Sequence, residues 1–132
     1  MTTYVLDASA LMTFFENRAG AAKVEELLAK AADAERPLAM CVVNWGEVYY
    51  SLWRARGEKI ARAKLLEIAQ LPIEVVDADM QLTEEAASLK GRYNLPYADA
   101  FAGALARSRK AALVTSDRDF ERVASELNTL WV

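Results

Sequence analysis

Four acidic residues lie at or near the starts of predicted helices in this chain: Asp7, Glu47, Asp99 and Asp117. The sequence contains no histidine, which excludes a Ser-His-Asp relay, an imidazole general base and a histidine zinc site. Hydrolytic chemistry would have to come from carboxylates and a cation that they bind. Oxygen ligands without imidazole or thiolate favour Mg²⁺ or Mn²⁺. Such ions lower the pKa of bound water and stabilise a leaving oxygen, which is the chemistry of phosphodiester hydrolysis.

Each of these acids also has a purely structural interpretation. Asp7 can cap a helix, and Asn44 with Glu47 three residues later is a plausible capping box. Asp99 and Asp117 would lie in first turns, where the helix dipole favours a negative charge. Taken singly, each acid is at least as well explained by helix capping as by metal binding, so only their convergence would point to a site.

Predicted strands and helices alternate along the chain. We expect apolar strands at residues 4–6, 38–43, 73–76, 112–115 and 130–132, and helices at 8–15, 21–34, 44–56, 59–69, 80–93 and 97–106, with a last helix after Asp117. Strands that are apolar throughout and alternate with helices indicate a parallel sheet covered on both faces. A helix that follows or feeds a parallel strand begins at the carboxyl edge of the sheet. The four acids should therefore meet at this edge, where open α/β sheets bind ligands.

Four segments give the chain a resemblance to a known family. In order along the chain, they are Val5-Leu6-Asp7-Ala8-Ser9, Glu47, Leu95-Pro96-Tyr97-Ala98-Asp99-Ala100 and Val114-Thr115-Ser116-Asp117-Arg118-Asp119-Phe120. With them the chain resembles the PIN-domain ribonucleases, and within these the VapC-type toxins of VapBC toxin-antitoxin pairs. The resemblance implies a single PIN domain over residues 1–132, folded as a three-layer α/β/α sandwich with a five-stranded parallel sheet.

The resemblance also implies roles for individual residues. The catalytic and metal-binding acids would be Asp7, Glu47, Asp99 and Asp117. Asp119 is either a further metal ligand or a first-turn residue before Phe120. Ser9 and Thr115 look like hydrogen-bonding residues that hold carboxylates or metal-bound water, although capping or turn formation explains each equally well. Asn44 could line the site, but capping is the favoured interpretation.

As a family member, the chain would be a Mg²⁺- or Mn²⁺-dependent endoribonuclease and the toxin of a type II toxin-antitoxin system. It would form a homodimer and would be inhibited by a cognate VapB-type antitoxin whose tail lies across the active-site groove. Two neighbouring predicted helices carry five large aromatic residues: Phe14, Phe15, Tyr49, Tyr50 and Trp53. We expect about three of them in the core and two exposed for that partner. The RNA target stays open.

Composition limits the class and location of the protein. A chain of 132 residues with 54% hydrophobic and 27% charged residues fits one compact, soluble domain. It shows neither a signal peptide nor an apolar run near the ~20 residues that span a bilayer, so we expect a cytoplasmic protein without a membrane partner. The single cysteine, Cys41, is interpreted as a buried strand residue, because no histidine could activate it as a nucleophile.

The net charge of −3 is not typical of a nucleic-acid binder. Positive charge is nevertheless concentrated in two stretches, Arg54, Arg56, Lys59, Arg62 and Lys64 in one and Arg107, Arg109 and Lys110 in the other. Solvated helix faces and phosphate contacts explain these stretches equally well. In a dimer, they could combine in one groove.

Two other functional classes are compatible with alternating strands and helices. A phospho-accepting receiver domain could use Asp77, which also follows a predicted strand, but that family needs a second acid beside the first, and Asp7 is followed by Ala8. No lysine follows the last predicted strand either. A non-catalytic interaction module with a degenerate site is the other alternative, and the presence of all four acids argues against it.

Overall fold

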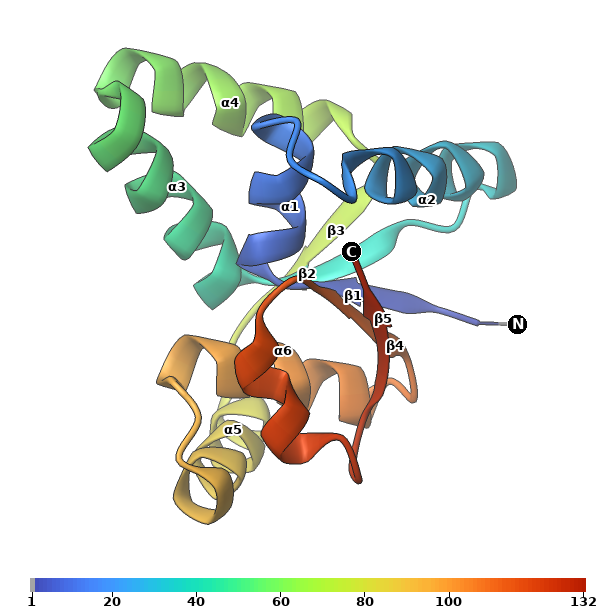
Figure 1. The fold of residues 1–132 in the computed structure, drawn as a ribbon, viewed down its shortest axis with the longest axis vertical. Helices are drawn as coiled ribbons and strands as arrows, with labels where there is room; N and C mark the ends of the chain where they lie inside the picture. Colours follow the sequence, from blue (N-terminus) through green and yellow to red (C-terminus); the bar gives the residue numbers. More distant parts are fainter. Residues whose placement is uncertain (1) are drawn as a thin grey trace.

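A five-stranded parallel sheet separates two layers of helices in the computed structural model, which describes residues 2–132 (Figure 1). The strands are β1 (Tyr4–Leu6), β2 (Leu38–Cys41), β3 (Ile73–Val76), β4 (Ala112–Thr115) and β5 (Asn128–Trp131). Their order across the sheet is β3-β2-β1-β4-β5, and all neighbouring pairs are parallel. The predicted three-layer α/β/α class is confirmed.

The helices are α1 (Ala8–Phe15), α2 (Ala21–Ala34), α3 (Val42–Arg56), α4 (Glu58–Gln70), α5 (Met80–Tyr93) and α6 (Tyr97–Ser108), followed by the 3₁₀ helix η1 (Arg118–Val123). Helices α1 to α4 cover one face of the sheet, and α5, α6 and η1 cover the other (Figure 1). Among residues 2–132, no helix is long and apolar enough to cross a membrane.

The strands contribute to two hydrophobic clusters because successive side chains point to opposite faces of a sheet. Val5 packs with α5 and α6, whereas Leu6 packs with α1, α2 and α3. On β4, Leu113 and Val114 divide in the same way. This burial on both faces explains why the central strands β1, β2 and β4 are mostly apolar. Cys41 is buried at the end of β2, as predicted.

The predicted start of α3 was wrong by two residues. The sequence predicted a strand through Val43 and a helix from Asn44, but β2 ends at Cys41 and the helix begins at Val42. Cys41 pairs with Val76, the last residue of β3, so both strands end at the same level. Asn44 therefore lies inside the first turn, where its side chain does not cap the helix. The predicted capping role of Asn44 is incorrect.

The last two elements also differ from the prediction. The helix after Asp117 is a six-residue 3₁₀ helix, and Asp117 caps it by accepting a hydrogen bond from the Asp119 backbone N–H. The final strand spans Asn128–Trp131 instead of residues 130–132. Its register alongside β4 places Thr115 opposite Trp131. The turn after Thr115 thus begins at the carboxyl edge of the sheet, where β1 also ends.

Candidate metal centre

Asp7 lies between the central strand β1 and helix α1, and its buried carboxylate caps the helix. Oδ1 accepts hydrogen bonds from the Ala10 backbone N–H at 2.9 Å and from the Ser9 hydroxyl at 2.7 Å. Oδ2 accepts a short hydrogen bond from the Thr115 hydroxyl. Three donors thus fix both oxygens of this carboxylate.

The hydroxyls of Ser9 and Thr115 also connect two loops. Ser9 Oγ accepts the backbone N–H of Ser116 at 3.0 Å, and Thr115 Oγ1 accepts that of Asp117 at 2.9 Å. Each hydroxyl therefore donates to Asp7 and accepts from the loop that carries Asp117. The bond to Asp117 is the turn formation expected of Thr115, and it coexists with the contact to a carboxylate.

Glu47 lies in the second turn of α3 and is partly buried. Its Oε1 accepts a hydrogen bond from Asn44 Nδ2 at 3.0 Å. The same nitrogen donates to the backbone carbonyl of Ala98 at 3.0 Å, one residue before Asp99. Sequence reasoning missed this role of Asn44, because a capping box has the same spacing of three residues as an amide-to-glutamate contact.

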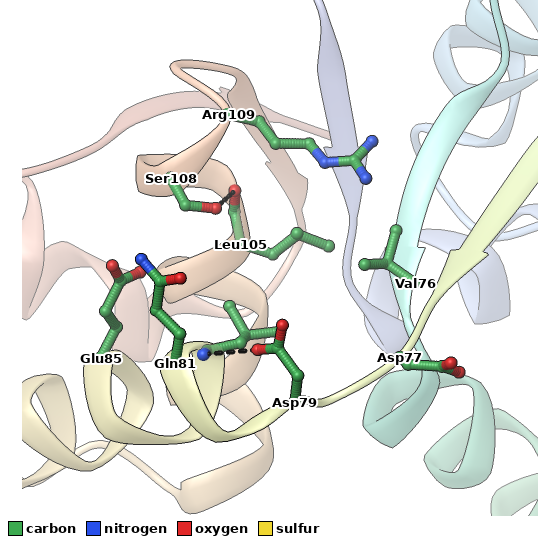
Figure 2. Close-up of a pocket in the computed structure, with 9 residues that line it drawn as sticks. Val76, Asp77, Asp79, Gln81, Glu85, Leu105, Ser108 and Arg109 are labelled. Carbon is green, nitrogen blue, oxygen red and sulfur yellow. Dashed lines mark hydrogen bonds between the residues drawn. The ribbon is translucent and has the colours of Figure 1, made fainter.

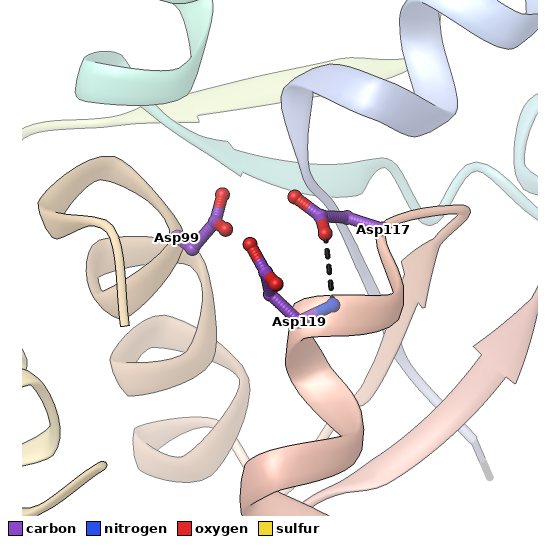
Figure 3. A group of neighbouring side chains, drawn as sticks. All are labelled: Asp99, Asp117 and Asp119. Atoms are coloured by element: carbon purple, nitrogen blue, oxygen red, sulfur yellow. Dashed lines mark hydrogen bonds between the residues drawn. The ribbon is translucent and has the colours of Figure 1, made fainter. Parts of the chain in front are cut away.

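Asp99, Asp117 and Asp119 form the tightest acidic group. One carboxylate oxygen of each lies within 4.8 Å of the others (Figure 3). Asp99 comes from the first turn of α6, whereas Asp117 and Asp119 come from the start of η1. Asp119 also forms an ion pair with Arg122 at 3.5 Å. The structure therefore brings Asp119 into the same group as Asp99 and Asp117, although the sequence left its role open.

Burial and mutual repulsion raise the pKa of the buried acids. For Asp7, burial raises the pKa from 3.8 to about 6, against the opposing effect of hydrogen bonds from Thr115, Ser9 and Ala10. For Asp99, burial followed by the Asp117 charge raises the pKa from 3.8 to about 8, with smaller contributions from Asp7 and Glu47. Burial likewise raises the pKa of Glu47, while its hydrogen bond with Asn44 lowers it.

Part of each pKa shift comes from the charge of a neighbouring acid, which reflects the proximity of acids from four separate segments. The Asp117 charge acts on Asp7, Glu47 and Asp99 alike. The sequence-predicted acids therefore meet at the carboxyl edge, with Asp7 and Glu47 around the group formed by Asp99, Asp117 and Asp119. For Asp119, the missing signal was the tightness of the 3₁₀ turn, which folds its carboxylate back beside Asp117.

The donor set suits a hard divalent cation. The carboxylate oxygen Oδ2 of Asp99 is buried without a hydrogen-bond partner. Within residues 2–132, the only ion pair that involves any of these five acids is Asp119 with Arg122. Apart from Arg122 beside Asp119, no cation among residues 2–132 is paired with these acids to relieve their repulsion. An all-oxygen cluster of this kind matches the ligand preference of Mg²⁺ or Mn²⁺.

A pocket of about 220 Å³ lies apart from this cluster, between the end of β3, the start of α5 and the end of α6 (Figure 2). Asp77 and Asp79 line it, and Asp79 accepts the Leu82 backbone N–H at 2.8 Å as the cap of α5. Arg109, also in the pocket lining, forms a bidentate pair with Glu74 at 3.0 and 3.2 Å. The five clustered acids do not line this pocket. Asp77, the acid of the receiver alternative, thus lies outside the cluster.

Comparisons with known proteins establish the family. The PIN domain family model matches residues 4–126, so the chain belongs to the PIN domain family. No curated protein sequence matches it significantly. This membership excludes the receiver alternative.

Several solved structures share this fold over nearly the whole chain. DNA-bound VapBC from Salmonella typhimurium is 17% identical with a TM-score of 0.77, covering 99% of this chain and 98% of that chain. VapBC2 from Rickettsia felis, bound to a DNA fragment from its promoter, is 19% identical with a TM-score of 0.74 and 98% coverage of both chains. VapC20 from Mycobacterium tuberculosis, a sarcin-ricin loop cleaving toxin, is 17% identical with a TM-score of 0.71, covering 95% of this chain and 96% of that chain.

Proposed function

We propose that this chain is a Mg²⁺- or Mn²⁺-dependent endoribonuclease and the toxin of a type II toxin-antitoxin system. The observation that carries the proposal is the buried, unpartnered oxygen of Asp99 within a group of acids at the carboxyl edge of a PIN fold. The VapBC complexes and the sarcin-ricin loop cleaving toxin among its structural neighbours support the same function. We further propose that residues 1–132 act as a single PIN domain in the cytoplasm.

Asp7, Glu47, Asp99 and Asp117 would hold the cation, with Asp119 as an additional ligand. When bound, a divalent cation lowers the pKa of water and stabilises the leaving oxygen of a phosphodiester. The chain's own contribution is to keep the ligands in place. Ser9 and Thr115 direct their protons at Asp7, which favours its ionised form. Asp99, whose pKa is about 8, is mostly protonated at neutral pH until a cation displaces its proton.

Helix α3 offers a surface for the antitoxin next to the acids. Tyr50 and Trp53 are 51% and 44% exposed, whereas Phe14, Phe15 and Tyr49 are partly buried. This division matches the expected three aromatics in the core and two exposed. Because Glu47 lies on the same helix, a partner that covers Tyr50 would lie beside the acidic cluster. We propose that a VapB-type antitoxin binds there and that the toxin is a homodimer.

Part of the positive charge is available for RNA. Four cations of the two basic stretches are paired with acids, namely Arg62, Lys64, Arg107 and Arg109. Arg54, Arg56, Lys59 and Lys110 form no ion pair with any residue of the described range 2–132. Three of these lie around the turn between α3 and α4, so we propose that RNA phosphates contact this turn.

The direct test is RNA cleavage by the purified chain, freed of any antitoxin. We expect cleavage of single-stranded RNA with Mg²⁺ or Mn²⁺ and none with EDTA. Asp99→Asn should abolish cleavage, whereas the matched variant Asp79→Asn should retain it, because Asp79 caps α5 outside the cluster. Cleavage in EDTA, or full activity of Asp99→Asn, would contradict the proposal. Mapping new RNA ends after expression in a bacterial host, with Asp99→Asn beside it, would identify the target.

A further inference from the structure

Asn44 is a fully buried amide whose donors are used and whose acceptor is not. Its exposed fraction is 0%, and Nδ2 donates to Glu47 Oε1 and to the Ala98 carbonyl, both at 3.0 Å. Its Oδ1 is buried without a hydrogen-bond partner. Asn44 thus contacts Glu47 directly and also contacts Ala98, the residue before Asp99.

The partners determine which way the amide points. Both atoms that face Nδ2 are acceptors, so the flipped amide would place Oδ1 of Asn44 against the oxygens of Glu47 and Ala98. Oδ1 is thus left without a partner because Nδ2 must point toward these two oxygens to donate to them. A buried acceptor without a partner destabilises the folded chain, and an apolar side chain of similar shape would avoid this cost.

Neither partner of Asn44 has another side chain to position it. Asn44 provides the only hydrogen bond to the Glu47 carboxylate within the described part of the chain, whereas Asp7 accepts three. Helix α6 begins without a side-chain cap. The hydrogen bond from Asn44 to the Ala98 carbonyl is therefore a side-chain contact that holds its first turn. Asn44 therefore links the carboxylate on α3 to the turn that carries Asp99.

We propose that Asn44 is a positioning residue, which holds Glu47 beside Asp99 so that both carboxylates reach the same cation. This role rests on the proposed function, since it presupposes that the acids bind a metal ion. Loss of Asn44 would free the Glu47 side chain to rotate and would release the first turn of α6 from α3. Metal affinity should fall even where the fold persists.

The experiment measures Mn²⁺ binding to the full, antitoxin-free chain by titration calorimetry. Asn44→Leu keeps the branched shape of the side chain and removes both donors and the unpartnered acceptor, so the variant should fold at least as stably as Asn44→Ala. We expect both variants to bind Mn²⁺ about 10-fold to 100-fold more weakly, the usual effect of removing a residue that orients a metal ligand. Thr13→Ala, which alters a buried polar residue near the far end of α1, should bind Mn²⁺ unchanged.

A metal-free measurement tests the contact itself. In a double-mutant cycle of Asn44→Leu and Glu47→Ala, the shifts in urea midpoint should be non-additive, because each variant removes one partner of the same hydrogen bond. Additive shifts, or unchanged Mn²⁺ affinity in Asn44→Leu while the unaltered chain binds Mn²⁺, would overturn the positioning role alone. Failure of the unaltered chain to bind Mn²⁺ would instead overturn the proposed function, and the positioning role with it.

Discussion

The two sides of the acidic cluster are held in different ways. On the side of β1, three donors fix both oxygens of the Asp7 carboxylate. On the side of α6, Oδ2 of Asp99 is buried without a partner, and the nearest groups are other acids. Their pKa values follow this difference, at about 6 for Asp7 and about 8 for Asp99. Hydrogen bonds from the protein position Asp7, whereas burial and the Asp117 charge oppose ionisation of Asp99.

The difference arises from the elements that carry the two acids. Asp7 ends the central strand, where backbone and hydroxyl donors from β4 and α1 converge. Asp99 comes from α6, which packs on the same face of the sheet as α5 and η1. Its carboxylate lies close to those of Asp117 and Asp119 at the start of η1. The proposed metal site would therefore combine one carboxylate that the protein holds rigidly with one whose charge is opposed by neighbouring acids.

The largest expected effect is on catalysis, where the two sides should be equally necessary. We expect Asp7→Asn and Asp99→Asn each to lower the rate of RNA cleavage at least about 1000-fold, since each removes a charge from the same proposed ion site. Rates measured with a fluorescent RNA in Mn²⁺ would check this. The isosteric control Asp33→Asn, on α2, should retain the full rate. Substantial activity in Asp7→Asn alone would mean that the fixed side only supports the fold.

The second prediction separates the two sides by stability without metal. At pH 8 in EDTA, Asp99→Asn should raise the Tm by at least about 4 °C, equivalent to about 1 kcal/mol in a chain of this size, because it removes a repelled and desolvated charge. Asp7→Asn should give a smaller gain, because an amide cannot accept from Ser9, Thr115 and Ala10 as the carboxylate does. Thermal unfolding followed by circular dichroism measures both. Equal rises in Tm for the two variants would show that the hydrogen bonds of Asp7 do not offset the cost of burying its charge.

The third prediction concerns the pH dependence of the metal-free chain. Both acids have folded-state pKa values above the ordinary 3.8, so the unfolded chain loses these protons first as pH rises. The free energy of unfolding contributed by these groups should therefore be highest below about pH 4 and should fall as the pH rises through about 8. In Asp99→Asn, the decline should end once the pH has risen past the Asp7 pKa of about 6. Urea unfolding of both proteins at closely spaced pH values measures this. The same decline in Asp99→Asn as in the unaltered chain would show that Asp99 is not its source.

The fourth prediction adds the cation to this comparison. At one Mn²⁺ concentration, the rise in Tm should be larger at pH 8 than at pH 5, because protons compete with the ion for Asp99 and Asp7 at the lower pH. Thermal unfolding with and without Mn²⁺ at both pH values measures this. In Asp99→Asn, the stabilisation by Mn²⁺ should be reduced at both. A Tm rise independent of pH would point to binding away from these acids.

The sequence predicted the sheet and the meeting of the acids because both depend on topology. Apolar runs interrupted by Asp7, Pro37 and Pro72 marked where strands could lie, and the bounds of β1, β3, β4, α2 and α5 match the prediction. The prediction of where α3 starts was wrong because Val42 and Val43 are typical strand residues. Only the pairing of Cys41 with Val76 shows that the strand has already ended.

Within the candidate site, the sequence could locate residues but could not show their contacts. It placed Asp7, Glu47, Asp99 and Asp117 at one edge, because strand and helix order determines that edge. It did not resolve the closeness of Asp119, which depends on a tight turn, or the contact of Asn44 with Ala98, which joins residues 54 positions apart. Contacts of this kind depend on how α3 packs on α6, and no local pattern encodes that packing.

The smallest expected effects concern the hydroxyls that distinguish the Asp7 side. Thr115→Val and Ser9→Ala each remove one donor to Asp7, so each should raise the pKa of Asp7 above about 6. The rise should be larger for Thr115→Val, because the Thr115 hydrogen bond opposes burial more strongly than that of Ser9. Titration of the Asp7 carboxyl carbon by NMR in the metal-free chain measures both.

Each variant leaves one backbone N–H without its acceptor, that of Asp117 for Thr115→Val and that of Ser116 for Ser9→Ala. Thr115→Val should be the less stable variant, by about 1 kcal/mol, because Thr115 is fully buried whereas Ser9 is only partly buried. An Asp7 pKa that stays unchanged in both variants would show that burial alone sets it. The two sides of the site would then differ in like-charge repulsion only, and the fixed position of Asp7 would have to come from its helix cap.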